Sequence, residues 1–302
     1  MLIKFAIQDF IDEREMMNLS DETLKGYRIF FKEFQTWLRE NDILDASDVT
    51  ASTIKGYLVY CKREKGNAPS TINNKLKNLK AFFNHLVENE NITKNPCSKI
   101  TKQKTEERIE VFTDVHIRQM LRYYRRLKRK DHEYTAYRNT AIIITLLGTG
   151  IRIGELRNLK WSDVIENQLV VFGKNRKQET VPLTKRVLNE LEELKLYCTR
   201  YFIDLPDYIF ANRNGTQMSY EATKSVFKRL QEVMNFKDVR LSAHTFRHTF
   251  AHRCIVNGMD VFTLQKILRH SSLSMTEKYL ALWGTALHEQ NEKYNPLNNF
   301  DI

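Results

Sequence analysis

Six side chains of this 302-residue sequence have the types and the order that chemistry on a phosphate group requires. The first arginine follows an apolar run that ends at the glycines of positions 148 and 150. A histidine and a second arginine stand three residues apart at the start of a predicted helix, so they share one helix face. The candidate site residues are Arg152, Lys174, His244, Arg247, His270 and Tyr279.

These residue types suit phosphoryl transfer without a metal ion. Arg152 and Arg247 can each present a planar guanidinium to phosphate oxygens and neutralise developing charge. Tyr279 offers a hydroxyl nucleophile, and Lys174, in a predicted turn between two strands, offers a proton to a leaving oxygen. His270 adds a hydrogen-bond donor.

Each of these residues also has an ordinary structural interpretation. An isolated arginine is usually a surface charge, the pattern His-x-x-Arg occurs by chance in many helices, and a tyrosine near a C-terminus usually packs. The joint order and spacing of the six side chains, and not any one of them, carries the prediction.

Charge and composition favour a polyanionic partner and a protein that does not enter membranes. The net charge is +11, and residues 111–302 hold 30 basic and 20 acidic side chains, whereas residues 1–110 are nearly neutral. The four cysteines match no zinc motif and indicate reduced thiols. The N-terminus lacks the apolar run of a signal peptide, and the apolar run at 141–147 is too short to cross a bilayer, so we expect a cytoplasmic protein.

The first hundred residues predict a small helical domain. Apolar residues recur at helical spacing from 3 to 17, after the N-cap Ser20, from about Ser52 to Gly66, and after Pro69. We expect the aromatic stripes of these four helices to be core and not platforms for base stacking. Residues 101–111 are polar and charged with little periodicity, which indicates a linker.

Residues 112–302 predict a second domain of helices with a small β-hairpin. It begins with an N-cap at Thr113 and a helix of seven cations between positions 118 and 130. Strands are expected at 168–172 and 179–183. Further helices are expected at about 184–201, 219–234, 242–257, 260–269, 273–281 and 286–293. The fold class is thus mainly α with a small sheet.

The motifs in this order resemble the tyrosine recombinase (phage integrase) family over nearly the whole chain. One motif is TGIRIGEL at 149–156, and the second comprises HTFRHTFA at 244–251, Gly258, Gln265, LRHSS at 268–272 and TEKY at 276–279. VFGKNRK at 171–177 followed by VPL at 181–183 resembles the family's lysine hairpin. One departure is Arg269, where relatives usually have glycine; we expect it to alter the local turn and not the chemistry.

The resemblance implies a fold and a mechanism. Residues 1–100 would be a SAM-like core-binding domain and residues 112–302 an α+β catalytic domain. Tyr279 would form a 3′-phosphotyrosyl bond, with Arg152, Arg247 and His270 on the non-bridging oxygens. Lys174 would protonate the 5′-oxygen, His244 would assist the tyrosine, and Glu155 would orient the region of Arg152. No metal ion, ATP or other cofactor is implied. Four protomers would exchange strands between two double-stranded DNA sites through a Holliday junction.

The biological role is open between several candidates at this point. The four-helix domain starts almost at Met1, as in compact Xer-type recombinases and short integrases of mobile elements. The tail 283–302 lacks a basic ending, which favours an integrase or excisionase of a mobile element over an Xer-type dimer resolution recombinase. A type IB-like topoisomerase and a DNA-binding module without activity are the alternatives of other classes. The tail's apolar residues predict a segment exchanged between protomers.

Overall fold

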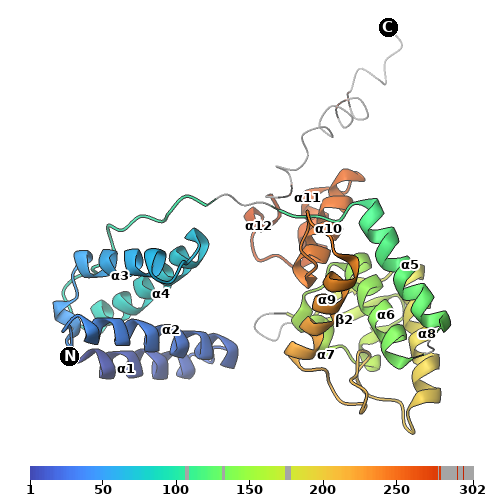
Figure 1. Cartoon of the computed structure of the whole chain (residues 1–302), viewed down its shortest axis with the longest axis horizontal. Coiled ribbons are helices and arrows are strands. Elements are labelled where there is room, and N and C mark those ends of the chain that lie inside the picture. The colour runs from blue at the N-terminus through green and yellow to red at the C-terminus, as the bar shows by residue number, and fades with distance from the viewer. Residues whose placement is uncertain are drawn as a thin grey trace. The chain divides into compact units, whose positions relative to one another are not determined.

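The computed structural model describes residues 1–105, 109–130, 133–173, 178–277, 279, 291 and 295. The chain forms two compact units, residues 1–107 and residues 108–302, each with its own hydrophobic core (Figure 1). Helices dominate both units, and a three-stranded antiparallel sheet lies in the second. The predicted fold class, mainly α with a small sheet, is confirmed. Among the described residues no helix is long and apolar enough to cross a membrane.

The first unit consists of four helices with short connections. Ser20 accepts a hydrogen bond from the Thr23 amide at the start of its second helix, and Thr50 and Thr53 form a reciprocal cap at the third. Pro69 is the first residue of the fourth helix, where its missing N–H costs nothing. The helices are α1 (Ile3–Met16), α2 (Asp21–Glu40), α3 (Ala51–Arg63) and α4 (Pro69–Glu88), with a 3-10 turn at Ala46–Asp48.

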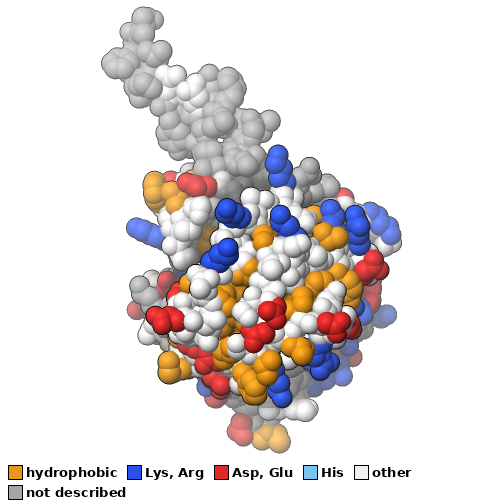
Figure 2. Space-filling model, turned by 90° about the vertical axis from the view of Figure 1, so that its left-hand side faces the viewer, with side chains coloured by type: hydrophobic (Ala, Val, Ile, Leu, Met, Phe, Trp, Pro, Cys, Tyr) orange, Lys and Arg blue, Asp and Glu red, His pale blue; other side chains and the backbone are white. Residues whose placement is uncertain are grey.

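Aromatic rings form the centre of this unit, as the sequence predicted. Phe10 packs edge-on against Phe31 and Phe82 at centroid separations of 5.5 and 5.7 Å, and all three rings are buried. These rings are therefore core and not platforms for bases. Figure 2 shows one face of this unit, on which basic, acidic and apolar side chains are intermixed.

The second unit is built around α6 (Tyr134–Thr149). Its apolar run includes Ala141, Ile142 and Ile143, which are fully buried because α5 (Asp114–Lys130), α8 (Lys185–Tyr201) and α10 (Ala243–Val256) pack against this helix. Thr113 caps α5, since its hydroxyl accepts from the His116 amide. The remaining helices are α7 (Ile153–Asn158), α9 (Tyr220–Met234), α11 (Val261–Leu268) and α12 (Ser274–Glu277), with a 3-10 turn at Trp161–Asp163.

The sheet has the order β1-β2-β3 and is antiparallel throughout. It comprises β1 (Val164–Ile165), β2 (Gln168–Phe172) and β3 (Gln178–Pro182). In the β2–β3 pair, Phe172 lies opposite Gln178 and Gln168 opposite Pro182. The predicted hairpin is therefore present, with its second strand one residue earlier than expected. Lys174, in the connection, lies outside the described residues.

Two of the predicted helices lie in the C-terminal part of the chain. Within the predicted helix 273–281, the described helix is Ser274–Glu277. Tyr279 lies in a turn, and its backbone amide donates to the Thr276 carbonyl at 3.0 Å. The expected helix at 286–293 and the exchange segment at 283–302 lie outside the described residues, apart from Asn291 and Asn295.

Gly150 ends α6 in the left-handed conformation, with φ at +61°. A β-carbon there would lie 2.5 Å from Phe250 Cδ1 and 3.0 Å from Leu268 Cδ2. We therefore predict that Gly150→Ala lowers the free energy of unfolding by about 2 to 4 kcal/mol, from backbone strain and overpacking together. Chemical denaturation followed by circular dichroism measures it.

Gly154→Ala is the matched control for this prediction. Gly154 lies in α7, and its added β-carbon would meet no atom within 4 Å. Alanine there should be neutral or stabilise by about 0.5 to 1 kcal/mol. Equal stability of the two variants would contradict the structural role of Gly150.

Candidate active site

Arg152 and Glu155 form the first half of the site, at the start of α7. Glu155 Oε2 accepts the Arg152 backbone amide at 2.8 Å, and Oε1 accepts from the Arg152 guanidinium at 2.8 Å. A carboxylate in the first turn is favourable because it faces the positive end of the helix dipole. The Glu155 side chain is 5% exposed and that of Arg152 is 38% exposed, so the guanidinium remains open to a ligand.

Arg247, on α10, is buried and donates to two backbone carbonyls. Its two terminal nitrogens lie 2.6 Å from the oxygens of Gly150 and Leu268. Burial, together with repulsion from Arg152, lowers the pKa of the Arg247 guanidinium to about 10, which still leaves it charged at neutral pH. Arg152 donates in turn to the Arg269 carbonyl at 3.0 Å. The two arginines therefore join the segment at 150–155 to the segment at 268–270.

Arg269, the departure noted in the sequence, keeps the left-handed backbone that a glycine would favour, with φ at +54°. Its guanidinium reaches Glu155 Oε2 at 2.6 Å, and both side chains are almost fully buried. Its Nε also lies 3.8 Å from Glu179 on β3. Arg269 thus connects the carboxylate that holds Arg152 to the β2–β3 hairpin, in which Glu179 lies opposite Val171.

His270 follows directly and is oriented from two sides. Its Nδ1 lies 2.7 Å from the Thr276 hydroxyl, and its amide donates to the Gln265 carbonyl at 3.1 Å. Because Thr276 belongs to α12, the short helix before Tyr279 sets the orientation of this ring.

Tyr279 is 2% exposed and packs against Leu264, Leu268 and other apolar side chains. Its hydroxyl lies 2.7 Å from His248 Nδ1. Burial raises the pKa of the Tyr279 phenol, and Arg247 partly offsets that increase. The tyrosine is therefore neutral at neutral pH, and a nucleophile in this position needs a proton acceptor.

His248 is a site residue that the sequence analysis did not single out. The ring of the predicted residue His244 packs edge-on against it, with centroids 4.1 Å apart. The available signal was its position one turn after His244 on the same helix. The hydrogen bond between its ring and the Tyr279 hydroxyl adds this second histidine to the candidate site.

A cleft of about 1530 Å³ begins at these side chains. Arg152, His244 and Arg247 line one part of it, and basic, acidic and apolar residues of α9 and the following loop line much of the rest. The further cations are Lys224, Lys228, Lys237 and Arg240. With Arg152 and Arg247 the described lining holds six cations against four carboxylates, those of Glu110, Glu221, Glu232 and Asp238, so its net positive charge suits a polyanion. Among the described residues, no group of three or more His, Cys, Asp or Glu side chains could hold a metal ion.

The model of the phage integrase family matches residues 110–283, and that of the phage integrase SAM-like domain matches residues 2–104. The chain belongs to the phage integrase family. It is therefore a tyrosine-type recombinase, and one of the two family models falls within each compact unit.

Curated relatives and solved structures agree with this assignment. Tyrosine recombinase XerD of Oceanobacillus iheyensis is 25% identical over 304 residues, covering 98% of this chain and 99% of its own. A tyrosine recombinase of Agathobacter rectalis is 28% identical over 270 residues, or 86% of each chain.

The solved structures show the likeness of fold. The XerH site-specific recombinase bound to a palindromic difH substrate matches with a TM-score of 0.75, at 19% identity and covering 90% of this chain and 80% of that one. The Tn1549 transposon integrase in complex with circular intermediate DNA matches with a TM-score of 0.69, at 23% identity and covering 92% and 95%.

The buried pair of Arg269 and Glu155 generates a prediction about pH. Burial acts to raise the pKa of the Glu155 carboxyl, but Arg269 and the hydrogen bonds from Arg152 outweigh it and hold that pKa below its ordinary value of 4.5. A lowered folded-state pKa contributes stability above the ordinary value, and that stability is lost as pH falls through the lowered one. At pH 7 we therefore expect Arg269→Gly to lower the free energy of unfolding by about 2 kcal/mol. This is less than the usual loss on breaking a buried ion pair, because Arg152 still pairs with Glu155 and glycine relieves the backbone strain at position 269.

Urea denaturation of wild type and Arg269→Gly between pH 7 and pH 3 measures this prediction. The difference between the two proteins should be largest above pH 4.5 and should shrink below it. With Glu155→Gln as background, the effect of Arg269→Gly should lose its pH dependence. A constant difference across the whole range would contradict the role assigned to this pair.

Proposed function

We propose that this recombinase cuts duplex DNA by attack of Tyr279 Oη on a scissile phosphate. The new bond joins Oη to phosphorus, the bond from phosphorus to the 5′-oxygen breaks, and the 3′-phosphotyrosyl link keeps the energy for rejoining. The observation that carries the proposal is the clustering of these side chains. The Tyr279 hydroxyl lies 2.7 Å from His248 Nδ1, and the segment at 268–270 accepts hydrogen bonds from both Arg247 and Arg152. The relatives solved with DNA support a DNA substrate.

Each side chain has a separate part in the proposed reaction. Arg152, Arg247 and His270 bind the non-bridging oxygens. The two arginines can do so because each guanidinium has five N–H donors, of which the protein's own acceptors use only some. The Tyr279 hydroxyl donates its proton toward His248, with His244 packed behind that ring. Lys174, in the connection between β2 and β3, protonates the 5′-oxygen. The ion pair of Arg269 with Glu179 on β3 supports this role, because it links the hairpin to the cluster.

We further propose that four protomers act on two double-stranded sites in the cytoplasm, with segment 283–302 exchanged between neighbours. The structure of a lambda integrase dimer on a core site supports assembly on DNA. Two biological roles have support of their own. The likeness to a transposon integrase favours a mobile element, whereas relatives named XerC and XerD favour dimer resolution.

We predict that the wild-type chain, but not Tyr279→Phe, forms a covalent adduct with DNA. Only the hydroxyl is lost, so the variant should bind DNA with similar affinity. Tagged protein is purified from expressing cells under denaturing conditions, with EDTA present, and the DNA that remains attached is sequenced. Attached DNA from the ends of a mobile element would support the integrase role, and attached DNA from one chromosomal site would support dimer resolution.

Tyr201→Phe is the control for this experiment, since Tyr201 is exposed on α8. It should form the adduct as wild type does. An adduct formed by Tyr279→Phe would contradict the assignment of the nucleophile, and supercoil relaxation without exchange between two sites would assign the chain to the topoisomerase class.

The contact between His248 and Tyr279 generates a second prediction. His248→Ala should slow single-turnover cleavage of the recovered DNA site by about 10² to 10⁴, the usual contribution of a general base. His252→Ala, one turn further along α10, should cleave at close to the wild-type rate. Rapid-quench assays on a denaturing gel measure both. Equal rates for the two variants would show that His248 does not accept the tyrosine proton.

A further inference from the structure

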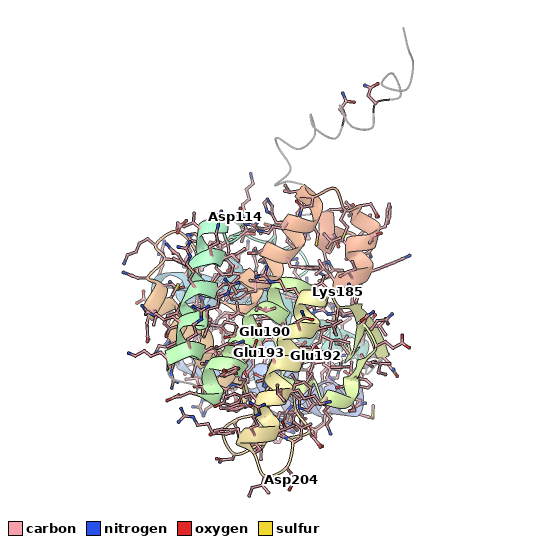
Figure 3. All side chains as sticks on the ribbon, turned by 90° about the vertical axis from the view of Figure 1, so that its right-hand side faces the viewer. Asp114, Lys185, Glu190, Glu192, Glu193 and Asp204 are labelled. Atoms are coloured by element: carbon pink, nitrogen blue, oxygen red, sulfur yellow. The ribbon has the colours of Figure 1, made fainter. Side chains whose placement is uncertain are left out.

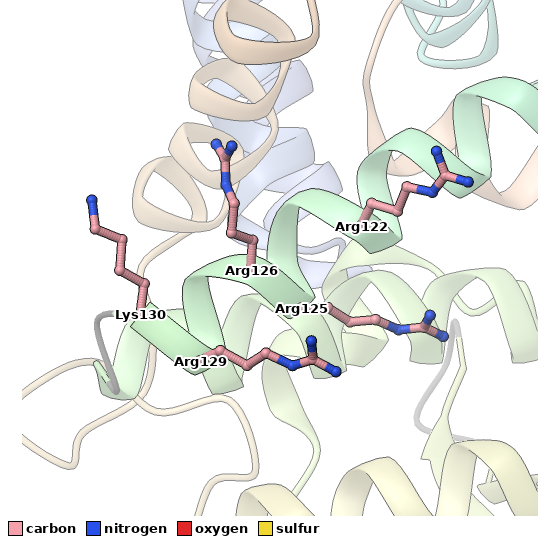
Figure 4. Close-up of a pocket in the computed structure, with 5 residues that line it drawn as sticks. All are labelled: Arg122, Arg125, Arg126, Arg129 and Lys130. Carbon is pink, nitrogen blue, oxygen red and sulfur yellow. The ribbon is translucent and has the colours of Figure 1, made fainter.

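Helix α5 presents a dense group of cations that the proposed reaction does not use. Between positions 118 and 130 the helix has seven basic residues, and its acidic residue is Asp114 in the first turn. Five of the cations surround one shallow hollow of about 420 Å³, and all five are exposed (Figure 4). These residues, the α5 basic face, are Arg122, Arg125, Arg126, Arg129 and Lys130.

The other cations of the helix show what ordinary pairing looks like here. Lys128 forms ion pairs with Glu190 and Glu193 of α8, the helix beside α5 in Figure 3, and Arg118 pairs with Asp114 at 3.6 Å. Within the described part of the chain, no carboxylate lies within ion-pair distance of the α5 basic face. The face therefore carries charge that the fold does not neutralise.

Helix stability does not explain this arrangement. Cations in a last turn are favoured by the helix dipole, which accounts for Arg129 and Lys130 but not for the arginines one and two turns earlier. Arg122 and Arg126, and likewise Arg125 and Arg129, stand four residues apart, where like charges destabilise a helix. An anionic ligand would remove that repulsion.

We propose that the α5 basic face binds the phosphate backbone of duplex DNA outside the cleft that holds the reacting strand. Four of the five side chains are arginines, whose planar guanidinium binds phosphate oxygens in pairs. Among the described residues, the lining of the hollow includes no apolar or aromatic side chain. A protein partner would need such an apolar centre, whereas DNA interfaces are polar and strongly basic.

The α5 basic face is separate from the reaction cleft. No described residue lines both hollows. In Figure 1, α5 runs along one edge of the second unit, whereas α12, which precedes Tyr279, lies at the other. A duplex on α5 is therefore either the flank of the bound site beyond the cleft or a separate molecule. The proposal rests on the proposed function only in that this chain binds duplex DNA.

The test compares two variants that each lose four positive charges. R122Q/R125Q/R126Q/R129Q neutralises the α5 basic face with residues that favour helix. K185Q/R186Q/K195Q/R200Q removes the same charge from exposed positions of α8. Circular dichroism confirms the fold of both. Adduct formation at Tyr279 on a short site tests the proposed function separately in the same preparations.

Two binding measurements distinguish the sources of DNA. In the first, fluorescence anisotropy follows binding to 15- and 60-base-pair duplexes between 50 and 200 mM salt. In the second, protein saturated with an immobilised 15-base-pair duplex captures a second, labelled duplex. Contact with flanking DNA predicts at least tenfold weaker binding of the α5 variant to the long duplex only. The slope of log affinity against log salt should then fall by about 2 to 4, near one per phosphate contact. Contact with a separate duplex predicts loss of capture instead.

The α8 control should resemble wild type in both measurements. Equal weakening of the two duplex lengths would place the arginines in the reaction cleft and overturn the proposal. It would also be overturned by an equal loss in the α8 control, or by no loss in either measurement, which is the result expected if the face binds an acidic protein.

Discussion

The site depends on hydrogen bonds from two guanidinium groups to main-chain carbonyls. Arg247 donates to Gly150 and Leu268, and Arg152 donates to Arg269, so each arginine crosses from its own segment to another. These bonds place residues more than a hundred positions apart in the sequence within one cluster. They also leave part of each donor set free for a ligand, because a guanidinium carries five N–H groups.

Three arginines so close together would repel one another without a counter-ion. Glu155 supplies it: its two oxygens accept from the Arg152 amide, the Arg152 guanidinium and the Arg269 guanidinium. A buried carboxylate is stable only when its oxygens are satisfied in this way. The same arrangement keeps Arg247 charged although burial lowers its pKa, so the site has its positive charge before DNA binds.

Much of the fold could be predicted from the sequence because its signals are local. Helical periodicity and caps such as Ser20 and Thr113 identify long helices, and two short strand-forming runs on either side of a turn identify the β2–β3 hairpin. The six-residue helix α7 and the two-residue strand β1 were missed, since neither is long enough to show a period. His248 was missed because its partner Tyr279 lies 31 residues away. The pairing of Arg269 with Glu155, 114 residues apart, is likewise visible only in the fold.

The acceptors of both arginines are carbonyl oxygens, and every amino acid carries one. A substitution at position 268 or 269 can therefore change packing or charge and still leave the oxygen that Arg247 or Arg152 needs. The orientation of the two guanidinium groups therefore depends on the path of the main chain and not on which side chains stand next to them. The sequence around the two arginines, which lie in a chain only 25% to 28% identical to these curated relatives, can consequently diverge without removing the acceptors that orient both guanidinium groups.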